Sequence, residues 1–89
     1  MDHTHLPIQV ISLCGADGQI KPLRFRFEDE AHGLHTVNIL EVLDVRNVMY
    51  VGIEAFRFLC RGAEDGESHV FELNYAVRSH RWSLLKKVY

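Results

Sequence analysis

The chain has 89 residues, of which 47% are hydrophobic and 25% are charged, and its formal net charge is −2. This balance is typical of a globular domain and excludes a disordered tail, and so small a net charge gives no general attraction to nucleic acid or to an acidic membrane. No apolar run reaches the roughly 18 residues of a transmembrane helix, and residues 1–14 lack a basic leader and a small-residue cleavage site. We therefore expect one cytoplasmic domain over residues 1–89, with a flexible tail at residues 1–6.

Glycine- and aspartate-rich turns recur at even spacing and divide the chain into six predicted strands. These strands span residues 8–14, 19–28, 34–45, 53–61, 68–78 and 81–89. Evenly spaced short strands are typical of antiparallel meanders, sandwiches and small barrels. We expect an all-β fold, a six-stranded antiparallel meander that closes into a small SH3-like barrel or a strongly curved sheet, since closure hides the edge strands.

The first two hairpins are predicted from their turn residues. Asp17-Gly18 suits a two-residue turn of the primed type, which needs positive φ at both positions. A three-residue loop at residues 31–33, with Gly33 in the left-handed region, would follow. These turns predict four apolar pairs on one face: Val10–Phe25, Ile8–Phe27, Phe25–Ile39 and Phe27–Val37.

The third strand is the ambiguous one. Val37, Leu40 and Leu43 also fit one face of a helix, and short apolar runs do not distinguish the two periods. Three valines and one isoleucine between positions 37 and 45 favour a strand. A helix at residues 36–45 would instead make the fold α+β. A turn is predicted at residues 47–52.

Two further hairpins share the strand at residues 68–78. A turn at Asp65-Gly66 and another at Ser79-His80 place the same side of this strand, with Phe71 and Tyr75, in the core, so the two registers support each other. The predicted pairs are Cys60–Phe71, Phe58–Leu73, Phe56–Tyr75, Val77–Trp82, Tyr75–Leu84 and Phe71–Val88. Trp82 is accordingly expected to be buried beside Val77.

From Ile20 to Lys87 the chain resembles a group of short bacterial all-β proteins. The resemblance rests on the segments IKPLRFRFEDE and VFELNYAVRSHRWSLLKK, on their strand pattern and on the late tryptophan. That group has no known activity. The resemblance implies a free-standing bacterial protein and no mechanism.

No constellation of a known enzyme or cofactor site is present. The six histidines lie singly near predicted turns, where solvated side chains are expected, and no cysteine or carboxylate spacing completes a metal site. Cys14 and Cys60 have apolar neighbours and are expected to be buried reduced thiols. No nucleophile elbow, P-loop or HExxH motif occurs. We expect no enzymatic activity, no cofactor and no metal.

Two surfaces remain as candidates for function. Apolar residues on the outward-facing positions predict either a protein interface, most simply in a homodimer, or β-bulges and bends that turn some of them inward: Leu40, Val42, Leu59, Leu85 and Tyr89. Arginines on the outward-facing positions offer the alternative, a small β-barrel that binds nucleic acid: Arg24, Arg26, Arg57, Arg61, Arg78 and Arg81. The leading expectation is a protein-interaction or structural module that acts as a homo-oligomer, pairing through these apolar residues or through an open strand edge.

Overall fold

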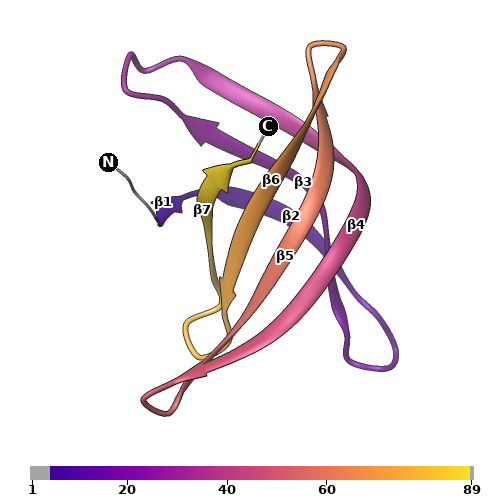
Figure 1. Cartoon of the computed structure of the whole chain (residues 1–89), viewed down its shortest axis with the longest axis vertical. Coiled ribbons are helices and arrows are strands. Elements are labelled where there is room, and N and C mark those ends of the chain that lie inside the picture. The colour runs from indigo at the N-terminus through magenta and orange to yellow at the C-terminus, as the bar shows by residue number, and fades with distance from the viewer. Residues whose placement is uncertain (1–4, 89) are drawn as a thin grey trace.

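The computed structural model describes residues 5–88 as one curled antiparallel sheet of seven strands (Figure 1). The strands are β1 (Leu6–Pro7), β2 (Gln9–Cys14), β3 (Ile20–Glu28), β4 (Leu34–Tyr50), β5 (Ile53–Glu64), β6 (Glu67–Ala76) and β7 (Arg81–Lys87). The all-β prediction is confirmed. The alternative helix at residues 36–45 is wrong, because these residues lie within β4. No helix among residues 5–88 is long and apolar enough to cross a bilayer.

The strands are ordered β1-β7-β6-β5-β4-β3-β2, and the N-terminal segment contacts both ends of this order. Leu6 of β1 lies opposite Leu84 of β7, whereas Val10 of β2 lies opposite Phe25 of β3. One short segment therefore joins the two edges of the sheet, which curls into a half-barrel (Figure 1). The expected flexible tail is wrong at Leu6, and residues 1–4 lie outside the described part of the chain.

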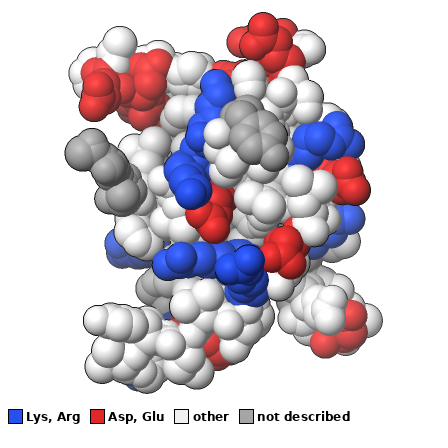
Figure 2. All heavy atoms as spheres, viewed as in Figure 1, with Lys and Arg blue, Asp and Glu red and all other residues white. Residues whose placement is uncertain are grey.

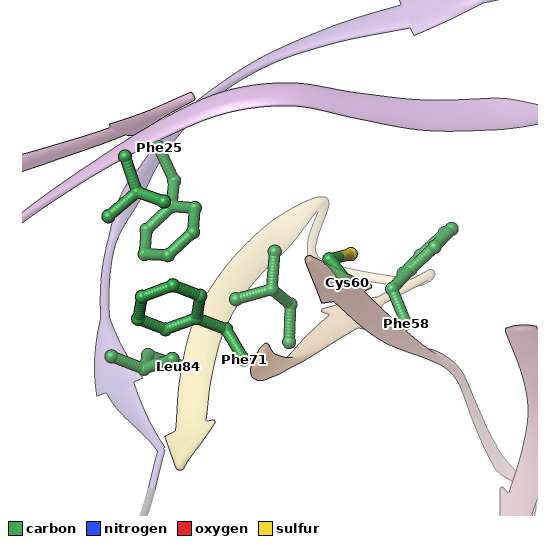
Figure 3. Close-up of a cluster of buried hydrophobic side chains, with 7 residues drawn as sticks. Phe25, Phe58, Cys60, Phe71 and Leu84 are labelled. Carbon is green, nitrogen blue, oxygen red and sulfur yellow. The ribbon is translucent and has the colours of Figure 1, made fainter. Parts of the chain in front are cut away.

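The concave face of the half-barrel carries the core (Figure 3). Its buried members come from five strands: Phe25, Val37, Phe58, Cys60, Phe71, Leu73 and Leu84. The rings of Phe25 and Phe71 meet edge to face at 5.2 Å, which is a favourable aromatic arrangement and joins β3 to β6 across the interior. Trp82 is half-buried and packs against this cluster.

Two β-bulges in β4 explain its ambiguous sequence. Its register against β5 shifts between Ile39 and Glu41 and again between Val42 and Asp44, so that Leu40 and Leu43 are the extra residues. Each bulge moves the inward-facing position by one residue. Ile39 and Val42 therefore both pack against the core. Because the bulges are three residues apart, the inward-facing apolar residues Ile39 and Val42 are also three residues apart, which is a helix-like interval.

The hairpin at Asp65-Gly66 is confirmed. Both turn residues have positive φ, at 51° and 82°. The predicted pairs Cys60–Phe71, Phe58–Leu73 and Phe56–Tyr75 are all present. Here the sequence was sufficient, because Asp-Gly at the centre of two alternating strands allows one turn type and therefore one register.

The other hairpins differ from their predicted registers. In the C-terminal hairpin Trp82 lies opposite Tyr75 rather than Val77, because the turn has four residues and His80 occupies the left-handed region at φ 59°. In the β3–β4 hairpin Phe25 lies opposite Val37 rather than Ile39. Both displacements are by two residues, so the same side chains still face the core.

The β2–β3 hairpin reaches its predicted pairing by another route. The backbone N–H of Gly15 donates to the carbonyl of Gln19. The loop therefore has three residues, 16–18, in place of the predicted two-residue turn, and Gly18 has φ 85°. A bulge between Ile11 and Ser12 then restores the predicted pair Val10–Phe25. The predicted turn at residues 47–52 is shorter than expected: β4 continues to Tyr50 and turns at Val51-Gly52.

Candidate functional site

The structure separates the five residues expected to form an apolar interface. Leu40 is exposed, whereas Leu59 and Leu85 are half-buried. Val42 packs against the core because the bulge at Leu40 turns it inward, so its expected outward position is wrong. Tyr89 lies outside the described residues. These side chains do not form one surface, and the apolar surface lies elsewhere.

The most distinctive surface is one side of β4. β3 pairs with β4 only from Leu34 to Asn38, whereas β5 pairs with β4 from Asn38 to Tyr50. Among the described strands, residues 39–50 of β4 therefore have no partner on the side of β3. We call these residues the open edge. In Figure 1 the β2–β3 and β4–β5 hairpins point apart below this divergence. Unpaired N–H and C=O groups along such an edge are a template for another strand.

The open edge and the turn that follows it carry a concentration of exposed apolar side chains. They are Leu40, Leu43, Val45, Met49, Tyr50, Val51 and Ile53. The tip is the most exposed part, with Tyr50 at 75% and Val51 at 81%. The end of this hairpin is the largely uncharged projection at the lower left of Figure 2. The sequence signal was the apolar run at residues 48–51, in a segment assigned only to a turn.

Val51 also has an unfavourable backbone. Its φ is +51°, in the left-handed region, where a β-branched side chain is a genuine outlier. Such a conformation costs on the order of 1–3 kcal/mol and is found most often at functional sites. Asparagine or aspartate normally occupies this turn position, as Asp65 does at the β5–β6 turn. An exposed valine contributes little to the core, so packing within the chain does not account for this strained conformation.

A groove lies between the two diverging hairpins. It encloses about 370 Å³ and is lined by Asp17, Gly18, Gln19, Ile20, Val45, Phe56 and Phe58. Its apolar wall comes from the inner face of β4 and β5, and Val45 belongs both to this wall and to the open edge. A strand added to the edge would therefore find an apolar surface beside its backbone partners.

The candidate arginines are dispersed over the sheet. Arg61 is paired with Glu41 at 3.2 Å, and Arg24 donates to Asn38. Arg24 lies opposite Asn38, which in turn lies opposite Ala63 of β5. Ala63 is six residues from Arg57 along β5, so Arg24 and Arg57 are separated by about 20 Å along the strand direction. On the face seen in Figure 2, basic groups are separated by acidic ones. No single basic groove connects the six arginines.

Arg57 differs from the other five candidate arginines in its surroundings. It lies directly opposite Arg46 in the β4–β5 ladder, and like charges in this position repel each other. The Nε of Arg57 is buried and has no hydrogen-bond partner among the described residues. An unsatisfied buried polar group is uncommon and calls for a physical explanation.

A cluster of one histidine and two carboxylates that the sequence did not reveal lies at the end of the β4–β5 ladder away from the Val51-Gly52 turn. Nε2 of His35 is 2.7 Å from Oδ2 of Asp29, and Nδ1 contacts Oε2 of Glu64. The His35 ring also stacks on Phe27, with centroids 4.7 Å apart and planes inclined by 7°. The expectation that His35 is simply solvated is therefore wrong. The signal in the sequence was its position two residues before Val37, on the inward-facing side of the strand.

These contacts shift the protonation of both partners. Hydrogen bonds to Asp29 and then to Glu64 raise the pKa of His35 above its ordinary 6.5. Hydrogen bonds from His35 and from the backbone of Gly33 lower the pKa of Asp29 below its ordinary 3.8. With a carboxylate at each ring nitrogen, His35 is held as a cation that clamps the β3–β4 hairpin to the end of β5. Its geometry is that of a clasp between hairpins, with no free nitrogen for acid–base work.

Neither the histidines nor the cysteines suggest a reactive centre in residues 5–88. No group of three His, Cys, Asp or Glu side chains in this range has the arrangement of a metal site. Burial raises the pKa of Cys60 to about 12, so its thiol is a poor nucleophile. Cys14 is exposed, which corrects the expectation that both thiols are buried.

No family model, curated protein or solved structure matches this chain. The resemblance to short bacterial proteins therefore stays a prediction.

Proposed function

We propose that this small β half-barrel is a protein-interaction module that acts as a homo-oligomer, and that its contact surface is the open edge of β4. The observation that carries the proposal is the length of β4: residues 39–50 continue past the last pair with β3 and have a strand partner on one side only among the described residues. Strand addition to an exposed edge is a common mode of protein recognition, with affinity from the backbone and specificity from alternate side chains.

The side chains of the edge support the same proposal. Monomeric proteins usually protect an edge with short length, charge, proline or β-bulges. The bulges at Leu40 and Leu43 lie in the first part of this edge, so residues 44–50 run without a bulge. This edge has no proline and carries Leu40, Leu43, Val45 and Met49, all exposed. Its charged residues Glu41, Asp44 and Arg46 disfavour pairing with strands whose charges do not match. The proposed apolar interface is therefore the open edge, residues 39–50, in place of the dispersed residues expected from the sequence.

A pair of matched lysine variants tests the proposal. Leu43 and Leu34 are both exposed residues of β4, but Leu43 lies on the open edge whereas Leu34 lies opposite Glu28 in the part that β3 covers. We expect sedimentation velocity to show a dimer for the wild type and for Leu34→Lys, and a monomer for Leu43→Lys with an unchanged β-type circular dichroism spectrum. A monomeric wild type at high micromolar concentration, or an intact Leu43→Lys dimer, would contradict the proposal.

Nucleic-acid binding is a second candidate because of one observation, the buried unpartnered Nε of Arg57 opposite Arg46. A phosphate group beside this pair would relieve the repulsion between the two guanidinium groups. Heparin chromatography separates the candidates. Retention that is lost in Arg57→Ala but kept in Arg26→Ala, an exposed arginine on β3, would support the second candidate. Equal elution of both variants with the wild type would leave the protein-interaction proposal alone.

A further inference from the structure

We propose that the strand added to the open edge is β4 of a second copy, paired antiparallel about a two-fold axis that passes through Val45. This inference rests on the proposed function and names the geometry of the contact. The first argument is position. Val45 lies near the middle of the open edge at residues 39–50, and the residues on either side of it, from 43 to 47, are all exposed.

Symmetry restricts the registers that are available. A two-fold axis between antiparallel neighbours is perpendicular to the sheet, so each residue faces a residue from the same face of the second copy. The axis therefore passes through a residue. Such an interface is self-complementary and closes as a dimer, because each copy uses the open edge of β4 once. The choice is among the few residues near the middle of the edge.

Charge selects Val45 from these residues. A centre on Val45 sets Asp44 opposite Arg46 of the second copy, and the symmetry repeats this pair on the other side. Both side chains are available, with exposures of 51% and 78%, and their contact within one chain is only a surface pair at 3.2 Å. Opposite charges in directly facing positions stabilise a strand pair, and like charges destabilise it.

The neighbouring centres lack this complementarity. A centre on Asp44 sets two carboxylates face to face, and a centre on Arg46 does the same with two guanidinium groups. A centre on Asn47 sets both charged residues opposite uncharged ones, Asp44 opposite Tyr50 and Arg46 opposite Val48. Among these four registers, only the one centred on Val45 places both Asp44 and Arg46 opposite a residue of opposite charge.

Apolar coverage agrees with the same register. With the axis at Val45, Tyr50 at the tip of one copy reaches the bulged end of the other copy's open edge, which carries Leu40. These two side chains are otherwise 75% and 52% exposed. The register thus covers an exposed leucine near one end of the edge with the aromatic residue at its other end, twice per dimer, as a self-complementary surface requires.

Charge reversal tests this arrangement. In the proposed register, Asp44→Arg gives each copy two positive charges that face the same charges of its partner, and Arg46→Asp gives two negative charges. We expect each variant alone to dimerise about tenfold more weakly than the wild type or worse. Mixed together, the two variants are fully complementary and we expect a heterodimer of wild-type affinity. Wild-type affinity in each variant alone, or no recovery in the mixture, would overturn the register.

Cysteine cross-linking gives an independent reading. In a Cys14→Ser background, Val45→Cys should form a disulfide-linked dimer under mild oxidation, because the axis brings the two thiols together. Asn47→Cys is the matched control, since its copies would lie about 13 Å apart. Cross-linking at position 47 instead of 45 would overturn the register and leave the proposed function intact. A wild type that stays monomeric, with no cross-link at either position, would overturn both.

Discussion

Val37 lies directly against the backbone of Gly62, so closely that a Cβ atom at position 62 would come within 2.5 Å of its Cγ1. Both residues are buried, and they lie two rows apart on the same face of the β4–β5 ladder. The missing side chain at Gly62 is what lets the first bulged part of β4 approach β5. A side chain at position 62 would force Val37 or the strand to move.

Gly62→Ala should therefore destabilise the protein by about 1–3 kcal/mol, as overpacking of a core usually does. Urea unfolding followed by Trp82 fluorescence measures the loss. Val37→Ala removes the atom that would clash, so the cost of Gly62→Ala should be smaller in that background. Equal costs in the two backgrounds would show that Val37 is not the obstacle.

Trp82→Ala should cost about 3 kcal/mol, near the low end for loss of a large aromatic side chain, because Trp82 is only half-buried. Its ring centroid lies 4.8 Å from that of Tyr75 and 5.4 Å from that of Phe58. Thermal unfolding by circular dichroism measures the effect, and Trp82→Phe should recover part of it. An unchanged melting temperature in Trp82→Ala would mean that this aromatic contact does not stabilise the fold.

The sequence predicted which residues face the core more reliably than which residues face each other. Alternation determines the side of a strand, and a register error of two residues leaves that side unchanged. Tyr75, Trp82 and Leu84 therefore lie on the predicted face although their partners differ. The register depends on turn length, and only Asp65-Gly66 encodes its turn without ambiguity.

The remaining errors have local physical causes. The side chain of Asp29 accepts hydrogen bonds from the backbone of Ala31 and Gly33, which lengthens the predicted loop at residues 31–33 to residues 29–33 and places His32, not Gly33, in the left-handed region. The open edge could not be predicted, because the point at which β3 and β4 diverge is a property of tertiary structure. An open strand edge was expected in general terms, but not which strand would have it.

Val51→Asn should stabilise the protein by about 1 kcal/mol, because asparagine tolerates the left-handed conformation that valine resists. Little packing is lost, since Val51 is 81% exposed. Differential scanning calorimetry at low concentration isolates the effect on one chain. A lower melting temperature for Val51→Asn would indicate that the valine side chain makes a stabilising contact within the protein.

The clasp at His35 should make stability depend on pH in a defined sense. Because the folded pKa of His35 is raised, its contribution is complete below the ordinary value of 6.5 and is lost as pH rises through the folded pKa. Because the folded pKa of Asp29 is lowered, its contribution is complete above the ordinary 3.8 and is lost as pH falls through its folded pKa. The clasp is therefore complete between these two values.

Melting temperatures measured from pH 5 to pH 9 test this sign. The wild type should lose more stability on the alkaline side than His35→Gln does, and His69→Gln, which leaves the clasp intact, should follow the wild type. Parallel curves for the wild type and His35→Gln would show that the clasp contributes nothing to the pH dependence.

Amide hydrogen exchange along β4 reports whether its open edge is paired with a second copy. If the open edge pairs with another copy, amides of residues 43–47 that point away from β5 should exchange more slowly at high protein concentration and faster on dilution. Amides of Leu34 to Asn38, which β3 already covers, should show no such dependence. Exchange at residues 43–47 that is fast and independent of concentration would contradict the account, because it would show an edge that remains unpaired.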